Sequence, residues 1–199
     1  MVVLTVIGFV RHGVTAWNKE GRAQGNSDVP LDDEGIEMAK SVADRLSKEQ
    51  WDVIYTSHLI RAKKTAEIIA EQMPDVELVE DARLREFSGG LIEGTTEAER
   101  IEKWGKDWKE QDMGFEPHES IVSRGMESIM DIKNKHAGQR VLVVSHGGLI
   151  KRLLNELITD TNYETHLDNT SLTIVELNDD KNLCQLFNCT AHLQQKVES

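Results

Sequence analysis

The chain begins with an apolar run that ends abruptly in a cation, an imidazole and a glycine. Residues 2–10 read VVLTVIGFV and are followed by Arg11, His12 and Gly13. The length of the run and its β-branched content are typical of a buried strand rather than a helix. Arg11 and His12 therefore stand at the carboxyl end of the predicted strand, which is the edge where open parallel α/β sheets bind ligands.

A second apolar run ends in the same way far downstream. Residues 141–144 read VLVV and lead into Ser145, His146 and Gly147. We therefore expect two strands to deliver a histidine followed by a glycine to one edge of the same sheet.

Strand-like and helix-like segments alternate along the chain, as in an α/β sandwich. Further strands are predicted at 51–56, 76–79, 171–177 and 183–189. Helices are predicted from about 33 to 46, from 57 to about 73, from about 120 to 135 and from 147 to 157. The last two strands flank a polar turn and form a hairpin. The expected fold is a three-layer α/β sandwich, with helices on both faces of a mostly parallel sheet that has an antiparallel edge strand.

Two local details of the helices are also predicted. Ser57 is placed to cap the helix that follows it. Helical spacing puts Val122, Met126, Ile129 and Ile132 on one face of the helix over 120–135, which we expect to be the buried face.

The middle of the chain differs in character from the rest. A polar helical section from about 95 to 111 carries Trp104 and Trp108, and Thr96 and Glu99 have capping-box spacing. We interpret residues 94–117 as an inserted helical lobe within one domain that spans 1–199. An ordinary crossover connection explains the same pattern equally well. The apolar side chains of this segment either wall a substrate pocket or, as is more common, pack the lobe onto the body; they are Trp104, Trp108, Met113 and Phe115.

Composition excludes several kinds of partner. The formal net charge of −12 argues against nucleic acid or an anionic membrane surface. No stretch approaches the roughly 18 apolar residues that span a bilayer. We predict that Cys184 and Cys189 are reduced thiols in a cytoplasmic protein. The spacing of the cysteines and histidines does not match a zinc or redox site, and no glycine-rich dinucleotide motif follows the first strand.

The remaining histidines are scattered. His58, His118, His136 and His166 are predicted to lie on the surface, and His192 to be a structural partner near the carboxyl terminus.

The residues at the strand ends suit an anionic ligand. Arg11 follows the first strand, and Arg61 lies near the start of the helix after the second. Guanidinium groups and helix amino termini both bind phosphate oxygens. Between such cations a neutral His12 can attack a phosphoryl group, and Glu86, in a turn-rich stretch, is the leading candidate to protonate the leaving group. To do so Glu86 must hold a proton at neutral pH, through burial or the charge of the phosphate.

Four ordered motifs together resemble a known family. They are RHGVTAWN at 11–18, SHLIRA at 57–62, LRE at 84–86 and SHGG at 145–148. In this order they are similar to the motifs of the histidine phosphatase superfamily, also called the phosphoglycerate-mutase-like family. Further similar features occur at 21–25, 28–35, 169–171 and 188–193.

This resemblance implies a set of roles. His12 is implied as the nucleophile and Glu86 as the proton donor. The implied phosphate pocket is made by Arg11, Arg61 and His146. Further phosphate or substrate contacts are implied for Asn18, Gln24, Gly25 and the Gly147 amide. The resemblance implies a small phosphorylated substrate, no metal and no organic cofactor.

The sequence also departs from the family pattern. Val14 stands where many members have Glu or Gln, which we expect to tune activity rather than remove it. Phe87 and Ser88 replace the basic-aromatic residues typical of the cofactor-dependent mutases, and residues 94–117 are rich in acidic side chains. These features favour a phosphatase. A phosphoglycerate mutase and a non-catalytic phosphate-binding domain remain as alternatives, and the oligomeric state is left open.

Overall fold

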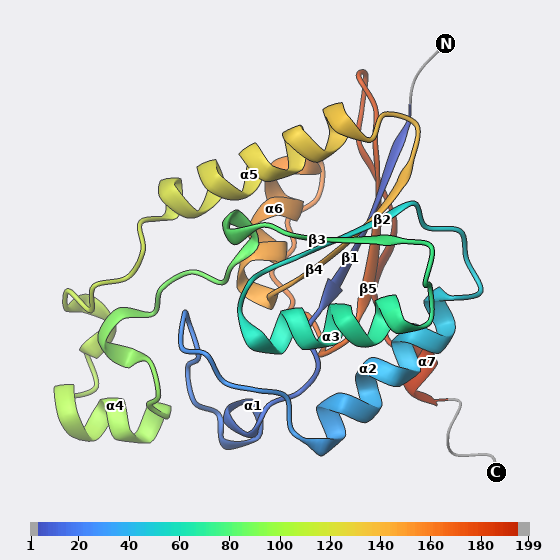
Figure 1. The fold of residues 1–199 in the computed structure, drawn as a ribbon. Coiled ribbons are helices and arrows are strands. Elements are labelled where there is room, and N and C mark those ends of the chain that lie inside the picture. The colour runs from blue at the N-terminus through green and yellow to red at the C-terminus, as the bar shows by residue number, and fades with distance from the viewer. Residues whose placement is uncertain (1–3, 195–199) are drawn as a thin grey trace.

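A six-stranded sheet forms the centre of the molecule (Figure 1). The computed structural model describes residues 4–194, so Val2 and Val3 of the predicted first strand lie outside the described part. The strands are β1 (Thr5–Arg11), β2 (Val53–Thr56), β3 (Glu77–Glu80), β4 (Arg140–Ser145), β5 (Leu172–Leu177) and β6 (Leu183–Cys189). Their order across the sheet is β3-β2-β4-β1-β5-β6. This arrangement confirms the predicted α/β sandwich.

Strand direction follows the prediction for both parts of the sheet. The pairs β1–β4, β4–β2 and β2–β3 are parallel, whereas β5 runs antiparallel to both β1 and β6. Parallel neighbours end at the same edge. The register pairs Arg11 with Ser145 and Thr56 with Val144, so His12, His146 and Ser57 emerge next to one another.

Helices cover both faces of this sheet (Figure 1). They are α1 (Ala16–Glu20), α2 (Asp33–Leu46), α3 (Ile60–Glu71), α4 (Glu97–Trp104), α5 (His118–Lys135), α6 (Gly147–Leu157) and α7 (Ala191–Gln194). Short 3₁₀ turns lie at Ala82–Leu84, Gly90–Ile92 and Trp108–Glu110. Asp32 caps α2 by accepting the Gly35 amide.

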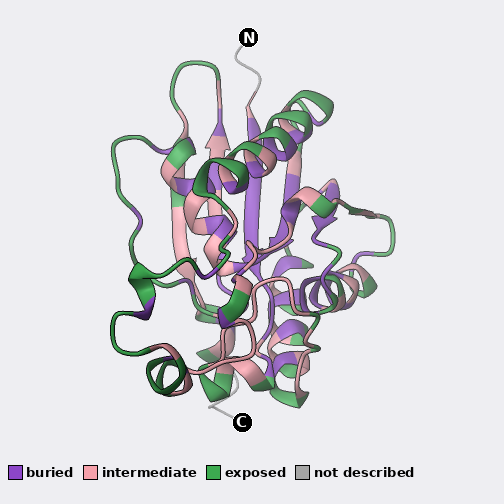
Figure 2. Ribbon diagram, turned by 90° about the vertical axis from the view of Figure 1, so that its left-hand side faces the viewer, coloured by how far each residue is buried: buried purple, intermediate pink, exposed green. Residues whose placement is uncertain are grey.

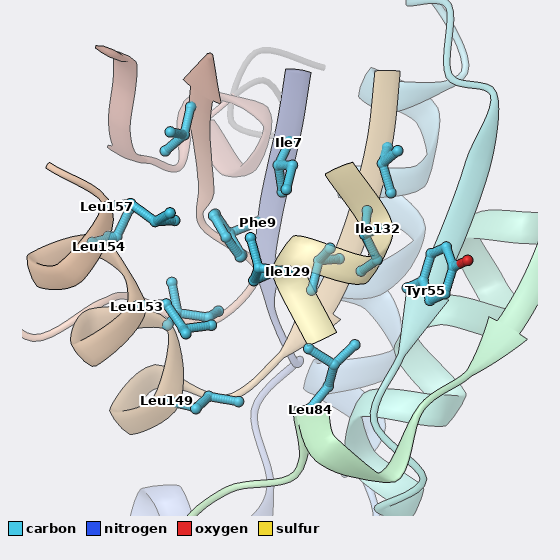
Figure 3. Close-up of a cluster of buried hydrophobic side chains, with 14 of the residues drawn as sticks. Ile7, Phe9, Tyr55, Leu84, Ile129, Ile132, Leu149, Leu153, Leu154 and Leu157 are labelled. Atoms are coloured by element: carbon cyan, nitrogen blue, oxygen red, sulfur yellow. The ribbon is translucent and has the colours of Figure 1, made fainter. Parts of the chain in front are cut away.

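The core has two layers because successive strand residues point to opposite faces. Ile7 and Phe9 of β1 pack with apolar residues of α5 and α6, as Figure 3 shows. Val10 of β1 packs on the other face, against α2 and α3. Figure 2 shows buried residues along the central strands, with exposed residues on the outer sides of the helices. The central strand β1 is thus held rigidly from both sides up to Arg11.

The buried face of α5 differs from the prediction. Val122 and Met126 are only half-buried, and the centre of the face is Gly125. A Cβ at this glycine would lie 2.9 Å from Leu153 Cδ2 of α6, so only glycine allows the two helices to approach this closely. The close approach rotates the contact by about one residue and buries Ile121 in place of Val122.

Two other local predictions were wrong. The amino-terminal cap of α3 is Leu59, which makes no side-chain cap bond, and the Ser57 hydroxyl instead lies 2.9 Å from His146 Nε2. His136 is buried rather than on the surface, because its Nε2 lies 3.0 Å from the Tyr55 hydroxyl and its Nδ1 2.7 Å from Gln139 Oε1.

The segment 94–117, which includes α4, lies to one side of the sheet (Figure 1). Thr96 and Glu99 form the predicted capping box. Trp108 and Met113 are buried with Ile92 in a small apolar cluster of their own, whereas Phe115 is exposed. Within the described residues no helix is long and apolar enough to cross a membrane. Cys184 and Cys189 are free thiols.

The carboxyl-terminal helix α7 supports the end of β1. His192 is buried, and its Nε2 lies 3.2 Å from the Thr170 hydroxyl. The Thr170 amide in turn donates to the Arg11 carbonyl at 3.0 Å. His192 is therefore a structural partner, as its position suggests.

We expect His192 to make the fold sensitive to acid. Burial, followed by the Arg45 charge, lowers the pKa of His192 to about 4. In the unfolded chain a histidine titrates near 6.5. Between these values the unfolded chain binds a proton that the folded protein does not, so stability falls as the pH falls. The loss is about 2 kcal/mol by pH 5.

Urea unfolding of the wild type and of His192→Gln at about pH 7 and about pH 5 measures this effect. The stability lost on acidification should be smaller in the variant by roughly that amount. Equal losses in the two proteins would remove His192 as a source of the acid sensitivity.

Candidate active site

A cavity of about 200 Å³ lies at the carboxyl ends of β1 and β4. Nearly all of the residues singled out in the sequence line it, namely Arg11, His12, Asn18, Gln24, Gly25, Arg61, Glu86 and Gly147. The remaining one, His146, is fully buried, and its ring centroid lies 5.3 Å from that of His12. The fold thus brings the four sequence motifs to one place.

A larger cavity, about 550 Å³, lies between the 28–31 loop and α3. It contains none of the predicted site residues. Its two lysines, Lys63 and Lys64, already pair with Glu80 and Glu67. Size alone therefore does not identify the site, and the clustering of chemically competent groups does.

The His12 imidazole is buried and oriented by the backbone. Its Nδ1 lies 2.7 Å from the Gly13 carbonyl oxygen. A carbonyl only accepts, so Nδ1 carries the proton and Nε2 keeps its lone pair. Burial, followed by the charges of Arg61 and Arg11, holds the pKa of His12 well below the ordinary value of a histidine. His12 is therefore a neutral imidazole whose free nitrogen is nucleophilic at neutral pH.

His146 lies beside His12 and is also neutral. Burial, followed by the Arg61 charge, lowers its pKa well below the usual value. Its Nε2 lies 2.9 Å from the Ser57 hydroxyl, and that oxygen accepts the Leu59 amide at 3.2 Å. The hydroxyl can therefore donate to Nε2, which leaves the proton on Nδ1. This Nδ1 is buried and has no protein partner within the described part of the chain.

Arg11 and Arg61 are each held through the terminal nitrogens of the guanidinium group. Arg61 donates from Nη1 to the Ser27 carbonyl and from Nη2 to the Gly25 carbonyl, both at 2.8 Å. Arg11 donates from Nη1 to the Leu167 carbonyl, and this Nη1 is 2.9 Å from His166 Nε2. Among residues 4–194, the Nε of each arginine is buried without a partner.

Such orphaned donors indicate an anion site. Buried polar groups are normally hydrogen-bonded, and an unpaired donor on a cation is costly. Burial lowers the pKa of Arg61 to about 10 and also lowers that of Arg11, but Arg61 remains charged at neutral pH. With His146 Nδ1, these donors provide the hydrogen-bonding capacity that a phosphate dianion requires.

Glu86 lines the same cavity. Its Oε2 accepts the Gly148 amide at 3.0 Å and its Oε1 accepts the Phe87 amide at 3.1 Å. A Cβ at Gly148 would lie 2.5 Å from Phe87 Cε1 and 2.7 Å from Glu86 Oε1. The glycine at the start of α6 is therefore what allows the carboxyl group to sit against the helix.

Asn18 and Gln24 line the cavity, and their side-chain oxygens are already hydrogen-bonded. The Asn18 Oδ1 accepts the Thr15 amide at 3.1 Å, and the Gln24 Oε1 accepts the Thr15 hydroxyl at 3.0 Å. With their oxygens engaged, both side chains can offer N–H donors to an anion. Gly25 differs from them, because its carbonyl is already held by Arg61.

Some lining residues were not identified from the sequence. Arg22 and Phe87 line the cavity, and so does His166, which was predicted to lie on the surface. His166 is exposed as predicted, yet its ring contacts Arg11. Ser57 was recognised as part of a motif, but its contact with His146 was not foreseen. No local sequence signal marks these contacts, because each joins residues far apart in the chain.

The arrangement has no obvious metal-binding component. Within residues 4–194, no group of three or more histidine, cysteine or carboxylate side chains is placed to hold a metal ion. The groups that face the cavity are instead cations, amide donors, one carboxyl group and a neutral imidazole.

Comparison with known proteins agrees with the motifs. The model of the histidine phosphatase superfamily (branch 1) matches residues 7–190. A metal-independent phosphoserine phosphatase of Arabidopsis thaliana is 34% identical over 200 residues, covering 96% of this chain and 84% of that protein. A 2,3-bisphosphoglycerate-dependent phosphoglycerate mutase of Gloeobacter violaceus is 33% identical over 166 residues, covering 77% of this chain and 76% of the mutase.

Solved structures show the same fold. A mutant phosphoserine phosphatase of Entamoeba histolytica in complex with phosphoserine aligns with a TM-score of 0.80 and 28% identity, over 95% of this chain and 99% of that one. The chain belongs to the histidine phosphatase superfamily, whose members similar to it include both phosphatases and phosphoglycerate mutases.

Proposed function

We propose that this protein is a metal-independent phosphomonoester hydrolase that acts on a small phosphorylated metabolite in the cytoplasm through a phosphohistidine intermediate. The observation that carries the proposal is the state of His12, a buried neutral imidazole with Nδ1 held by a carbonyl and two arginines beside it. An imidazole in this state can act as a nucleophile but not as a cationic phosphate binder.

In the first step His12 Nε2 attacks phosphorus in line with the ester oxygen. The N–P bond forms as the P–O bond to the leaving group breaks. The departing oxygen takes a proton from Glu86, which enters this step as the carboxylic acid. The Nδ1–H bond to the Gly13 carbonyl stabilises the positive charge that develops on the ring.

In the second step a water molecule attacks the phosphohistidine. Glu86, now a carboxylate, takes a proton from the water, the O–P bond forms, and the N–P electrons return to Nε2. Inorganic phosphate then leaves. In both steps the unpartnered donors of Arg11, Arg61 and His146 stabilise the charge on the transferring oxygens, which is most of what phosphoryl transfer requires.

The proposed independence of metal ions rests on the positive charges of the cavity. Two buried guanidinium groups supply the cationic stabilisation that metal ions give in other phosphoryl-transfer sites. The Arabidopsis relative is also named a metal-independent phosphatase.

We also propose that residues 94–117 form an inserted lobe beside the cavity. Trp108 and Met113 belong to an apolar cluster separate from the two that flank the sheet, which supports this view. Arg22 of the cavity wall bonds Glu99 of α4 at 2.6 Å and so ties the lobe to the site. The acidic character of the lobe favours a phosphatase over a mutase that must hold a glycerate carboxylate.

Phosphate release from a panel of phosphomonoesters in the presence of EDTA tests the proposed function. The panel contains an aryl phosphate, sugar phosphates, nucleotides, phosphoserine and 3-phosphoglycerate, with a parallel assay for mutase activity. We expect EDTA-insensitive hydrolysis of at least one ester, and the ranking of the esters to define the substrate class.

Two results would contradict the proposal. Isomerisation of phosphoglycerate without hydrolysis would identify a mutase, the activity for which the Gloeobacter relative is named. Binding of inorganic phosphate without turnover of any ester would favour the non-catalytic phosphate-binding domain.

A further inference from the structure

Glu93 accepts an unusual number of hydrogen bonds for a carboxylate outside the reacting groups. It lies in the turn that joins the Glu86 segment to the 94–117 segment. Its Oε1 accepts the amides of Asn26 at 3.0 Å and Gly89 at 2.8 Å. Its Oε2 accepts the Ser27 amide at 3.0 Å and the Ser27 hydroxyl at 2.6 Å. All four partners are donors, so the carboxylate is fully used.

These bonds fix the loop that holds Arg61. The Gly25 and Ser27 carbonyls accept both terminal nitrogens of Arg61, and Glu93 binds Asn26 and Ser27 in that same short loop. Glu93 therefore sets the position of the two carbonyls, and through them the direction in which Arg61 presents its free Nε to the cavity.

The glycine in this loop is explained by the same contact. A Cβ at Gly25 would lie 2.1 Å from Glu93 Oε1, in the space that the carboxylate occupies, and the residue has a φ of +52°. Both facts exclude a side chain here. A glycine is therefore needed at position 25 so that the Glu93 carboxylate can reach the loop.

We infer that Glu93 is a positioning residue for phosphate binding, which acts by holding the 25–27 loop and thereby aiming Arg61. The inference rests on the proposed function, because it assigns a phosphate ligand to Arg61. The negative charge of Glu93 also favours the charged form of the buried Arg61 guanidinium.

Glu93→Gln tests the inference with little change in shape. The new NH₂ group meets N–H donors where an oxygen accepted them, so the loop must shift. We expect the inhibition constant of inorganic phosphate and the KM for an aryl phosphate to rise about tenfold, with a smaller change in kcat. Ser27→Ala removes one of the four bonds and should change both constants in the same direction by about threefold.

Glu97→Gln is the matched control. Glu97 accepts hydrogen bonds from Arg100 and from Trp108 Nε1, at 3.2 and 3.1 Å, within the 94–117 segment, and it does not line the cavity. The Glu97→Gln substitution should leave KM and the phosphate inhibition constant unchanged. In an Arg61→Lys background, Glu93→Gln should raise KM and the phosphate inhibition constant by less than about threefold. The reason is that the loop carbonyls no longer hold a guanidinium group.

Several outcomes would overturn the inference. Unchanged phosphate affinity in folded Glu93→Gln would do so, as would an equal tenfold loss in the Arg61→Lys background. An altered preference between aryl and alkyl phosphates would show that Glu93 acts through the Glu86 segment instead. Failure of the proposed function is distinguishable, since the wild type itself would then hydrolyse no ester, whether or not it binds inorganic phosphate.

Discussion

Replacing His12 by alanine should abolish turnover and leave the fold intact. Without Nε2 there is no nucleophile for the phosphoryl group, and Glu86 cannot substitute because the proposed attack requires a neutral nitrogen. We expect kcat to fall roughly 10⁴- to 10⁶-fold, the range seen when a nucleophile is removed from a concerted site. Among the described residues the buried ring hydrogen-bonds to the neighbouring Gly13 carbonyl, so its loss breaks no long-range hydrogen bond and removes only the ring contact with His146.

Steady-state hydrolysis of an aryl phosphate, with circular dichroism and urea unfolding as checks on the fold, measures this effect. His118→Ala is the control, because His118 is exposed at the start of α5. Retention of most of the activity in well-folded His12→Ala would rule out the proposed mechanism.

Replacing Glu86 by glutamine should separate substrates according to their leaving groups. An alkoxide is strongly basic and needs a proton as it departs, whereas an activated aryl oxide needs little help. We expect a loss of about 10²- to 10⁴-fold for alkyl phosphates and a clearly smaller loss for aryl phosphates. Glutamine keeps one oxygen, which can accept the Gly148 amide, and gives up only the bond to the amide of the adjacent Phe87.

The ratio of kcat/KM for an aryl and an alkyl phosphate is the quantity to compare between Glu86→Gln and the wild type. The same ratio in Glu97→Gln should not change. Equal losses on both kinds of ester would remove Glu86 from the role of proton donor.

Much of the fold was predictable because its signals are local. The apolar runs that became β1 and β4 end in polar residues, and the helical stripe over 147–157 has the same bounds as α6. The carboxyl-terminal hairpin follows from its polar turn. In each case the pattern depends on residues that are close in the chain.

The predictions that were wrong concern contacts between distant segments. Gly125 sets the face of α5 only because α6 packs against it, and His136 is buried only because Tyr55 offers it a hydroxyl. Ser57 has the residue type of a helix cap, but its hydroxyl contacts His146, which follows strand β4. Local propensity does not contain this information.

The same distinction holds for the site. The motif residues gather as expected, because strand register brings their positions to one edge of the sheet. Glu93 and His166 could not be identified, since their partners are the backbone of a remote loop and the side chain of Arg11. The catalytic roles of the motif residues remain predictions that the variants above test.

The most direct test of the mechanism is a search for the phosphoenzyme itself. Wild-type protein is mixed with an activated aryl phosphate, quenched with alkali within the first turnovers, and analysed by intact mass and peptide mapping. The mechanism predicts the added mass of one phosphoryl group, stable to alkali and labile to acid, located on His12 and absent from His12→Ala. Rapid hydrolysis with no labelled intermediate, or a label on any other residue, would contradict it.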